Sequence, residues 1–575
     1  MQTSLSLIAH AQHHPGTEAV TLQFTLKGID RQLVRRVDEE LSRVLVRIER
    51  LVNPIENKRG FKSSTKTPKP STMALMKAAA VIQFKTGNHA VLPPTLPVLD
   101  ALYAAAYFCI NEVTYHIIHN EPRVNAIATV DKHFNGISIR PSIDLIFCTP
   151  DECTWTWHRG DVLVGSSFVY TPTSDDVGHA LTIACTPPPS PDASPARVPI
   201  EPVVVHTSVV QACPDRSVFG PRQILGRVPP SNDGLRLMTY NILYSKYARA
   251  DREFNRMYPF AAPGVLQEAY RMPLVALELL ESRPDVVCLQ EMGETICRSY
   301  FEPLLAHHGY KGVYAGKAGS TPEGCAIFAR NDTFEAVETE VVAFSAAIDS
   351  LPRDSAITAF LHCHPQVDAA IRQVPSVGQI VTLLDKRHGH VVLVANTHMF
   401  YRADANIVRL VQAALFTAAI EATVARLSDN GATKVRVVVA GDLNARPMTS
   451  SIQFLLNGHV GCNHDDWQQA RAFRWTDRDI DDSGRPSEGT MDVPTQFSHS
   501  LKLRRAVETE FTTYLRNHEF TFQDTLDYIL VDPTSFRVVQ QFPLFTLEQV
   551  DSEKSLPSTV FPSDHVSIVC DVEYT

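Results

Sequence analysis

Six polar motifs lie at the ends of strand-like apolar runs in the second half of the chain. They are TYNIL, CLQE, NTH, GDLN, LDY and SDH, which contain Asn241, Glu291, Asn396, His398, Asp442, Asn444, Asp527, Asp564 and His565. Because the ends of neighbouring strands converge in space, we expect these side chains to gather in one place. Carboxylate and amide oxygens without cysteine are typical ligands of a hard cation such as Mg²⁺ or Mn²⁺. The motifs therefore predict a metal-binding site at the strand ends.

Each motif also has a plainer interpretation. A single Asp or Asn at a strand end usually makes a turn or caps a helix, and a buried Asp527 or Asn241 can be a purely structural hydrogen-bond hub. The Gly-rich stretch Gly309–Gly324 resembles a phosphate cradle, but a hairpin between two strands fits it better. Within that stretch, Lys317 is still placed to touch a substrate phosphate. Six such strand ends together favour a functional site over six unrelated caps.

An α/β domain has to position these motifs. After Gly234, strand-like runs alternate with helix-length segments, and the expected strands are Leu235–Tyr240, Val286–Leu289, Ala326–Phe328, Val391–Asn396, Val435–Ala440, Tyr528–Val531 and Val566–Val569. Helices are expected at Met272–Glu281 and Ile407–Leu427. This alternation predicts buried sheets covered by helices.

The preceding half of the chain has a different, β-rich pattern. Expected strands are Val20–Thr25, Ser142–Phe147, Ser167–Tyr170 and Ala180–Cys185, and apolar positions at helical spacing predict one amphipathic helix between Asp30 and Val52. Trp155 and Trp157 are expected in a buried core, and Tyr170–Pro187 suggests part of an immunoglobulin-like sandwich.

Two Pro/Ser/Thr-rich stretches, Ser63–Thr72 and Cys185–Pro202, favour exposed linkers or loops. We therefore expect an accessory β-rich domain at 1–203, a linker at 204–232 and the α/β domain at 233–575.

Composition excludes several classes of protein. The chain of 575 residues has 53 Lys and Arg against 63 Asp and Glu, a net charge of −10, which argues against binding duplex DNA by bulk charge. Its eleven cysteines include no CxxC pair, so we expect neither a disulfide framework nor a structural zinc site. We expect a reducing intracellular compartment instead. No membrane span is expected, and no secretory or transit peptide is visible before Arg31.

The ordered series TYNIL, LQE, NTH, GDLN, LDY and SDH resembles the endonuclease/exonuclease/phosphatase superfamily. EGCAIFARNDTF (323–334) and PSDHVSIVCDVEY (562–574) are similar to its branch of Ccr4-type deadenylases, nocturnin and 2′,5′-phosphodiesterases, and most of all to the last. LSRVLVRI (41–48) extends the likeness into the N-terminal domain. The resemblance implies a four-layer α/β sandwich, in which helices flank two mixed β-sheets.

The resemblance also implies roles for the matching residues. Implied metal ligands are Glu291, Asp442, Asn444 and Asp527; implied catalytic residues are Asp442, His565, His398, Asn241 and Asp564; implied substrate contacts are Asn396 and Lys317. Asp442 would position or deprotonate the attacking water. The Asp564 carboxylate would orient the His565 imidazole beside the phosphate, and His398 and Asn241 would hydrogen-bond its nonbridging oxygens.

The activity implied is that of a Mg²⁺-dependent phosphodiesterase, with Mn²⁺ as the other candidate cation. It would cleave 2′,5′-oligoadenylate and trim 3′,5′ poly(A) to AMP, with RNA as its partner and neither duplex DNA nor a membrane. The resemblance implies the mitochondrial matrix, with the cytoplasm as the alternative. Two other functions stay open: a nocturnin-like dinucleotide 2′-phosphatase and a catalytically silent scaffold of an RNA-processing complex. The chain departs from the branch after NTH, where Met399–Asp404 contains no proline.

Overall fold

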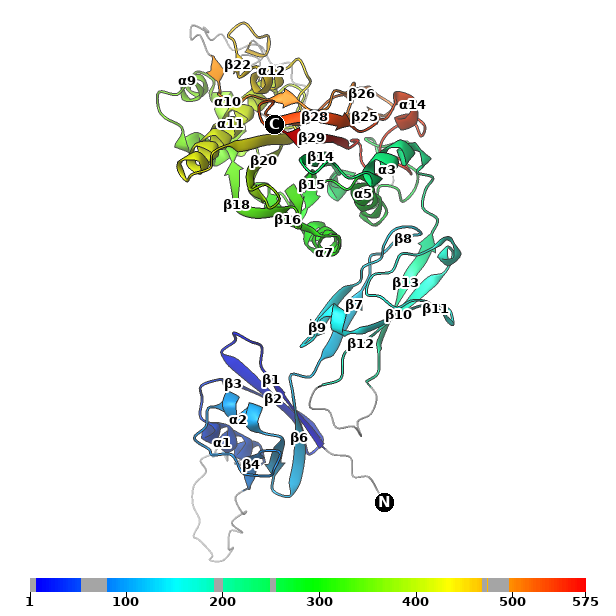
Figure 1. Cartoon of the computed structure of the whole chain (residues 1–575), viewed down its shortest axis with the longest axis vertical. Helices are drawn as coiled ribbons and strands as arrows, with labels where there is room; N and C mark the ends of the chain where they lie inside the picture. The colour runs from blue at the N-terminus through cyan, green and yellow to red at the C-terminus, as the bar shows by residue number, and fades with distance from the viewer. Residues whose placement is uncertain (1–6, 53–79, 191–199, 249–254, 468–472, 474–495) are drawn as a thin grey trace, which may run out of the picture. The chain divides into compact units, whose positions relative to one another are not determined.

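The chain forms two compact units in the computed structural model (Figure 1), which describes residues 7–52, 80–190, 200–248, 255–467, 473 and 496–575. The first unit comprises Met1–Val130, Ser138–Thr171 and Gly178–Val210, and the second comprises Asp131–Ile137, Pro172–Val177 and Gln211–Thr575. The expected domain limits stay a prediction. Within the expected linker, however, lie most of strand β13 (Val203–Gln211) and helix α3 (Gly220–Arg227). The expected loop at 63–72 lies outside the described residues.

The first unit contains a six-stranded mixed sheet whose central strands β1 and β6 are parallel. Its order is β3 (Ile29–Arg36), β2 (Ala19–Leu26), β1 (Leu7–Gln12), β6 (Val113–His119), β5 (Tyr107–Ile110) and β4 (Ile82–Lys85). Helices α1 (Leu41–Val52) and α2 (Val98–Ala104) contribute Val44, Ile48 and Leu102 to the core formed with one face of the sheet.

The single helix predicted between Asp30 and Val52 is wrong in its first part. Lys27 and Gly28 have φ of +53° and +77°, and they join β2 to β3 in a two-residue hairpin in which Leu26 pairs with Ile29. Strand pairing therefore takes the residues up to Arg36, and the helix begins only at Leu41.

The other strands of the first unit pair in antiparallel fashion. Strands β11 (Val162–Gly165), β10 (Thr154–Arg159), β12 (Ala180–Thr186) and β13 are consecutive neighbours, and β7 (Arg123–Ala128) pairs with β9 (Ser142–Ile146). Trp155 and Trp157 are 3% and 0% exposed, as expected of core residues. Ser167–Tyr170 is not a strand, because Tyr170 makes only an isolated bridge with Ile139. The unit is β-rich, and its immunoglobulin-like character stays a prediction.

Two six-stranded mixed sheets form the second unit. The first has the order β16 (Tyr310–Gly316), β17 (Glu323–Arg330), β15 (Val286–Gly293), β14 (Gly234–Asn241), β29 (Ile568–Tyr574) and β28 (Phe536–Gln541). The second has the order β18 (Phe334–Ala343), β19 (Val377–Asp385), β20 (His390–His398), β21 (Val435–Asp442), β27 (Asp527–Val531) and β24 (Arg504–Arg505). Each contains one parallel pair, β14 with β15 and β20 with β21. All seven strands expected after Gly234 are present, the last beginning at Ile568.

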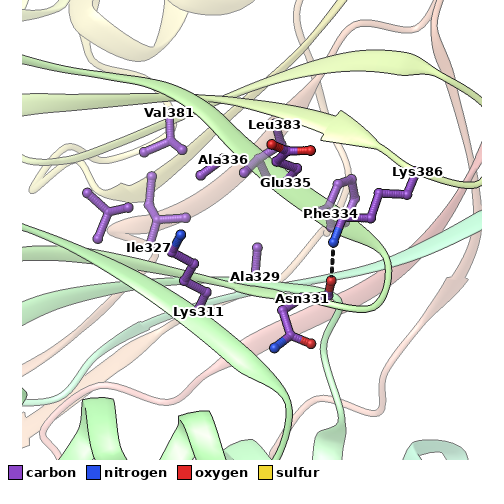
Figure 2. Close-up of a pocket in the computed structure, with 11 residues that line it drawn as sticks. Lys311, Ile327, Ala329, Asn331, Phe334, Glu335, Ala336, Val381, Leu383 and Lys386 are labelled. Carbon is purple, nitrogen blue, oxygen red and sulfur yellow. Dashed lines mark hydrogen bonds between the residues drawn. The ribbon is translucent and has the colours of Figure 1, made fainter.

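The two sheets share one apolar core. Leu237 and Val286 of the first sheet belong to the same buried cluster as Val392 and Val438 of the second. At one edge a cavity of about 100 Å³ opens between β16 and β17 on one side and β18 and β19 on the other (Figure 2). Its lining is mainly apolar, with Lys311 and Lys386 among its residues.

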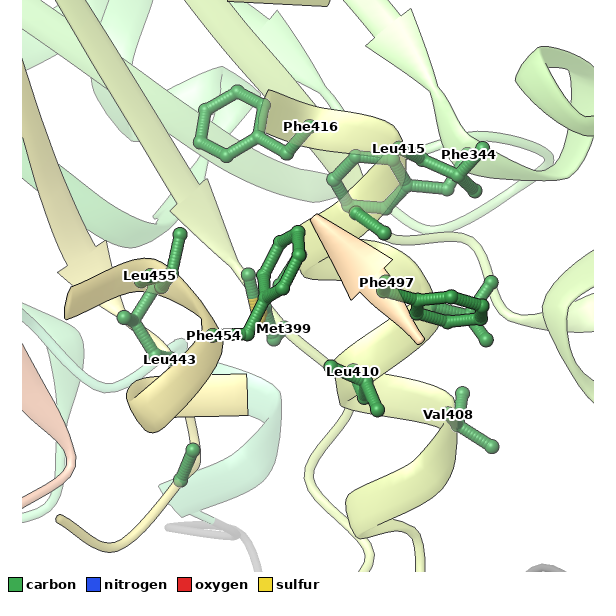
Figure 3. Close-up of a cluster of buried hydrophobic side chains, with 14 of the residues drawn as sticks. Phe344, Met399, Val408, Leu410, Leu415, Phe416, Leu443, Phe454, Leu455 and Phe497 are labelled. Carbon is green, nitrogen blue, oxygen red and sulfur yellow. The ribbon is translucent and has the colours of Figure 1, made fainter. Parts of the chain in front are cut away.

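Helices cover the outer face of each sheet. On the first sheet, α5 (Glu268–Ser282) and α7 (Glu302–His307) contribute to the core, and on the second α8 to α12 do so. Figure 3 shows Leu410 and Phe416 of α11 (Asn406–Asp429) in the same cluster as Phe454 and Leu455 of α12 (Ser450–Asn457). Helix, sheet, sheet and helix thus form four layers, as the resemblance implied.

The remaining helices and strands are α4 (Ser245–Ala248), α6 (Glu294–Ile296), α8 (Phe344–Ala347), α9 (Ala356–Cys363), α10 (Pro365–Gln373), α14 (Leu547–Val550), β8 (His133–Phe134), β22 (His459–Val460), β23 (Phe497–Ser498), β25 (Thr513–Arg516) and β26 (Thr521–Asp524).

Helix α11 is the one helix in the described residues that is long and apolar enough to cross a membrane by length and composition. However, 72% of its most apolar window is buried inside the second unit. Its apolar residues are therefore accounted for by packing on the sheet.

Candidate active site

The two parallel strand pairs bring the predicted polar residues to one edge of the second unit. Asn241 and Glu291 lie at the ends of β14 and β15, and His398 and Asp442 lie at the ends of β20 and β21. Asp442 pairs in register with His398 on one side and with Asp527 on the other. Asn241 Nδ2 donates to Glu291 Oε1 at 3.1 Å and to Asp442 Oδ2 at 3.0 Å, so one amide connects the two sheets.

Unusual backbone conformations aim these side chains. Glu291 has a φ of +57° and lies in a β-bulge of β15, and the backbone N–H of Tyr244 donates to its Oε2 at 2.7 Å. Gly441 has a φ of +141°, and a Cβ there would be 2.1 Å from the carbonyl oxygen of Thr397. Only glycine therefore allows Asp442 to lie beside His398. Strained backbone of this kind gathers at functional sites.

The His565 ring is held between two carboxylates. Its Nδ1 is 2.7 Å from Asp527 Oδ2 and its Nε2 is 3.7 Å from Asp442 Oδ2. Burial by itself lowers the pKa of His565, but the charges of Asp527 and Asp442 outweigh burial and hold the pKa well above its usual value. The two carboxylates therefore favour the protonated form of the His565 ring.

A second buried imidazole has the opposite character. His398 Nε2 is 3.5 Å from Asp442 Oδ2, and its Nδ1 is 3.3 Å from Lys317 Nζ, which also pairs with Glu323. Burial and the nearby charges of Lys317 and His565 lower the pKa of His398 well below its usual value. The two imidazoles that face Asp442 therefore differ: their surroundings favour the protonated form of His565 and the neutral form of His398. Such divergence is typical of acid–base sites.

The Asp564 carboxylate does not orient His565, and this corrects the pairing that the resemblance implied. The Tyr258 hydroxyl donates to Asp564 Oδ2 at 2.7 Å, so the side chain is turned toward the Tyr258 loop. Asp527 takes the orienting position because β27 lies beside β21. Ser563, between the two motifs, donates from its Oγ to the Asn241 carbonyl oxygen at 2.7 Å.

Asn396 does not face the site, and its predicted substrate contact is wrong. Its side chain is 0% exposed, and its Nδ2 donates to the carbonyl oxygens of Leu289 at 3.1 Å and Ala326 at 3.3 Å. Its Oδ1 accepts from Gln290 Nε2 at 2.8 Å. Asn396 therefore bridges the two sheets one layer below His398.

Asn444 joins two loops of the site. Its backbone N–H donates to Asp442 Oδ1 at 2.8 Å, and its Nδ2 donates to the Met399 carbonyl oxygen at 3.0 Å. This position fixes the Asp442 carboxylate, and the predicted metal contact of Asn444 stays a prediction.

The stretch Gly309–Gly324 forms the expected hairpin. Strands β16 and β17 pair in antiparallel fashion from Tyr310 to Gly316, and a Cβ at Gly324 would be 2.0 Å from the Ala315 carbonyl oxygen. The absence of a side chain at Gly324 therefore allows the two strands to lie close together, and it is not needed for binding phosphate.

The donor set of the site fits a hard cation. Oxygens of Asp442 and Asp527 lie within 4.8 Å of each other, and the buried Asp527 Oδ1 has no hydrogen-bond partner among the residues that the structure describes. Burial raises the pKa of Glu291, and the charges of Asp564 and Glu323 raise it further. Burial and Asp527 likewise raise the pKa of Asp442. A cation would relieve this surplus of negative charge, and Asp442 and Asp527 belong to a buried group that could hold one. The metal contact of Glu291 stays a prediction.

Sequence reasoning missed Glu323 and Tyr258. Glu323 is 0% exposed and connects Lys317 to the Tyr247 hydroxyl, which donates to its Oε1 at 3.2 Å. Glu323 is the first residue of the EGCAIF motif. Its position at the start of that motif was the one sequence feature that could have indicated a role in the site. The cavity in Figure 2 is separate, since none of the predicted site residues lines it.

Comparisons with known proteins agree with this geometry. A model of the endonuclease/exonuclease/phosphatase family matches residues 238–565. Human 2′,5′-phosphodiesterase 12 is 27% identical over 601 aligned residues, which cover 97% of this chain and 93% of that protein. Carbon catabolite repressor protein 4 homolog 1 of Arabidopsis thaliana is 26% identical over 456 residues, which cover 71% of this chain and 70% of that protein.

Solved structures match the second half of the chain. ANGEL2, described as a 2′,3′-cyclic phosphatase, is 21% identical with a TM-score of 0.46, over 59% of this chain and 95% of that one. The human nocturnin catalytic domain is 21% identical with a TM-score of 0.38, over 60% of this chain and 97% of that one. Since the family model covers more than half of the 575 residues and includes every strand end of the site, the chain belongs to the endonuclease/exonuclease/phosphatase family and is an enzyme of its phosphodiesterase and exonuclease kind.

Proposed function

We propose that the protein is a Mg²⁺-dependent phosphodiesterase and 3′-exoribonuclease that releases AMP from 2′,5′-oligoadenylate and from 3′,5′ poly(A). The observation that carries the hydrolytic part is the convergence of Asn241, His398, Asp527 and His565 on the Asp442 carboxylate. The substrate part is supported by the likeness to 2′,5′-phosphodiesterase 12, which extends over 97% of this chain. RNA is the proposed partner, and the mitochondrial matrix stays a prediction.

Asp442 is the proposed base for the attacking water. Its Oδ2 accepts a hydrogen bond from Asn241 at 3.0 Å, and its Oδ1 accepts one from the Asn444 backbone at 2.8 Å, so the carboxylate is fixed in orientation. A raised pKa suits a general base, because the carboxylate then takes up a proton more readily.

The two imidazoles have different proposed tasks. The His565 cation, held by Asp527, donates to a nonbridging phosphate oxygen and stabilises the charge that develops there. The neutral His398 ring donates from Nε2, because its Nδ1 faces Lys317 Nζ at 3.3 Å. Lys317 therefore acts on the substrate through His398, in place of the direct contact expected from the sequence.

Glu291, with Asp442 and Asp527, is proposed to hold Mg²⁺. When bound, the cation neutralises charge on the phosphate oxygens during hydrolysis. Oxygen-rich donor sets favour Mg²⁺ or Mn²⁺ over softer metals. Asn241 keeps Glu291 and Asp442 in place by donating to both carboxylates.

A product assay tests the proposal. Purified protein is incubated with 2′,5′-linked and with 3′,5′-linked oligoadenylate, each with Mg²⁺ or with EDTA, and AMP and inorganic phosphate are quantified. We expect AMP from both substrates with Mg²⁺ only, loss of the product in Glu291→Gln, and normal turnover in the exposed control Glu294→Gln.

The other outcomes separate the alternatives. Release of inorganic phosphate from a 2′-phosphorylated dinucleotide, without AMP from either oligoadenylate, would favour the phosphatase. No turnover of any of these substrates, together with no Mg²⁺ binding by calorimetry, would favour the silent scaffold.

A further inference from the structure

Three cysteines of the first unit lie together where β9 ends and β10 begins. The Sγ atoms of Cys148 and Cys153 are 4.0 Å apart, and Cys153 also interacts with Cys185 of β12. None of the three takes part in a disulfide in the structure. The cluster is unrelated to the site described above.

A rigid turn brings the first two thiols together. Between them, Pro150–Glu152 forms one 3₁₀ turn, and the Glu152 carboxylate accepts from the backbone N–H of Thr149 at 2.7 Å and from its hydroxyl at 2.9 Å. The Trp155 indole donates to the Pro150 carbonyl oxygen at 2.9 Å. The contact between the thiols is therefore built into the turn.

The two thiols belong to different sheets of this unit. Cys148 follows β9, and its Sγ contacts the carbonyl oxygens of Ile146 at 3.6 Å and Arg123 at 3.9 Å in the β7–β9 pair. Cys153 directly precedes β10 of the other sheet. Cys148 is half-buried and Cys153 is 9% exposed, so an oxidant of small size reaches Cys148 first.

We propose that Cys148 and Cys153 are a redox-active pair that forms a reversible disulfide when a peroxide oxidises the protein. The Cys148 thiolate attacks one oxygen of hydrogen peroxide and the O–O bond breaks, leaving a sulfenic acid on Cys148 and hydroxide, which takes the released thiol proton as water. The Cys153 sulfur then attacks the Cys148 sulfur; the S–S bond forms, the S–O bond breaks, and the hydroxyl leaves as water with the Cys153 proton. Two thiols lose two electrons, and the peroxide becomes two molecules of water.

The geometry demands only a small movement. A disulfide needs its sulfur atoms about 2 Å apart, so rotation of the two side chains has to close roughly half of the present separation. Cys185 is 0% exposed and has no direct route to the oxidant. Burial raises the pKa of both Cys148 and Cys153 to about 11, so the reaction accelerates as the pH rises toward that value.

Peptide mass spectrometry of the full-length protein tests the pair. The protein is treated with hydrogen peroxide, quenched with catalase, alkylated without reduction and digested with trypsin; Cys148 and Cys153 both lie in the peptide that ends at Arg159. We expect that peptide to lose about 2 Da and both alkyl groups, and to regain two alkylation sites after dithiothreitol.

Matched variants separate this pair from general oxidation. Cys148→Ser and Cys148→Ala should each abolish the change of mass, whereas Cys185→Ser and the exposed Cys363→Ser should retain it. Full alkylation of Cys148 and Cys153 after peroxide, at a dose that oxidises the exposed Cys462, would overturn the proposal. A Cys153–Cys185 linkage in the wild-type protein would overturn it as well.

Discussion

Two buried polar clusters lie at the two ends of strand β20, and only one of them balances its own charges. At the start of β20, Asp385 is 0% exposed and accepts from Arg387 Nη2 at 2.9 Å and from the Tyr574 hydroxyl at 2.8 Å. At the end of β20, His398 and Asp442 lie among further carboxylates. Both clusters contain a buried aspartate and lie between the same two sheets.

The pKa values express the difference. Burial by itself raises the pKa of Asp385, but hydrogen bonds from Arg387 and Tyr574 outweigh burial and lower the pKa below its usual value. Burial and neighbouring carboxylates instead raise the pKa of Glu291 and of Asp442. The balanced cluster stabilises the fold, whereas the unbalanced one has to be completed by a ligand. Burial of polar residues alone would not have distinguished them.

The largest expected effect is on activity. Asp442→Asn should lower kcat by about 10³-fold, because the base for the attacking water is lost. The same change should leave the metal-free protein at least as stable, since it removes a buried carboxylate that Asp527 repels. AMP release and thermal unfolding in EDTA check both parts. A fall in stability as large as that of Asp385→Asn would contradict the contrast between the clusters.

Asp385→Asn should have the opposite effects, a loss of stability with no loss of activity. The change should cost about 2 kcal/mol of unfolding free energy, because the buried side chain loses its charge-assisted hydrogen bonds from the partly exposed Arg387 guanidinium and from the Tyr574 hydroxyl. The kcat of the folded protein should be unchanged. Urea unfolding and AMP release measure the two effects, with the exposed pair variant Asp332→Asn as control, for which a loss below about 1 kcal/mol is expected.

Divalent cations should act on one cluster only. Mg²⁺ at 100 times its Kd should stabilise the wild-type protein by about 2.7 kcal/mol. Asp385→Asn should gain the same amount, whereas Glu291→Gln should gain little. Thermal shift titrations with Mg²⁺ and Mn²⁺ provide the measurement, and an equal gain in Glu291→Gln would place the cation elsewhere.

The smallest effect is expected at Tyr574. Tyr574→Phe removes one hydrogen bond to Asp385 and should cost about 1 kcal/mol at neutral pH. Because the folded pKa of Asp385 is below its unfolded value of about 4, its contribution is present above that pH and is lost as the pH falls through the folded pKa. Because that folded pKa lies well below pH 3, urea unfolding at pH 7 and at pH 3 should show nearly the same deficit for Tyr574→Phe.

Much of the site could be predicted because strand ends are visible in sequence. Asn241, Glu291, His398 and Asp442 lie at or near the ends of Val- or Leu-rich runs, and parallel pairing brings such ends together. Asp527 opens β27, which reaches the same edge because it runs antiparallel to β21. How far a side chain near a strand end lies from the open edge of the sheets cannot be predicted from the sequence in the same way. Asn396 and His398 are two residues apart and face the same side, yet only His398 reaches the open edge.

Contacts made through loops and turns could not be predicted. Tyr258 approaches Asp564 from a segment with no strand-end pattern, and Glu323 reaches Lys317 only after β16 and β17 have paired. In the first unit, the apolar spacing after Asp30 fits a helix, but the residues up to Arg36 form a strand. The reason is the two-residue turn at Lys27 and Gly28, which pairs them with β2.

The crossover connections described above also determine when the site can exist during folding. Strands β20 and β21 are parallel neighbours, so α11 has to cross the sheet before His398 meets Asp442, just as α5 has to cross before Asn241 meets Glu291. No fragment that ends before β21 contains a complete set of ligands. A divalent cation held by the proposed ligands would therefore bind only the nearly finished fold, and it should slow unfolding of the second unit while leaving the rate of its folding almost unchanged.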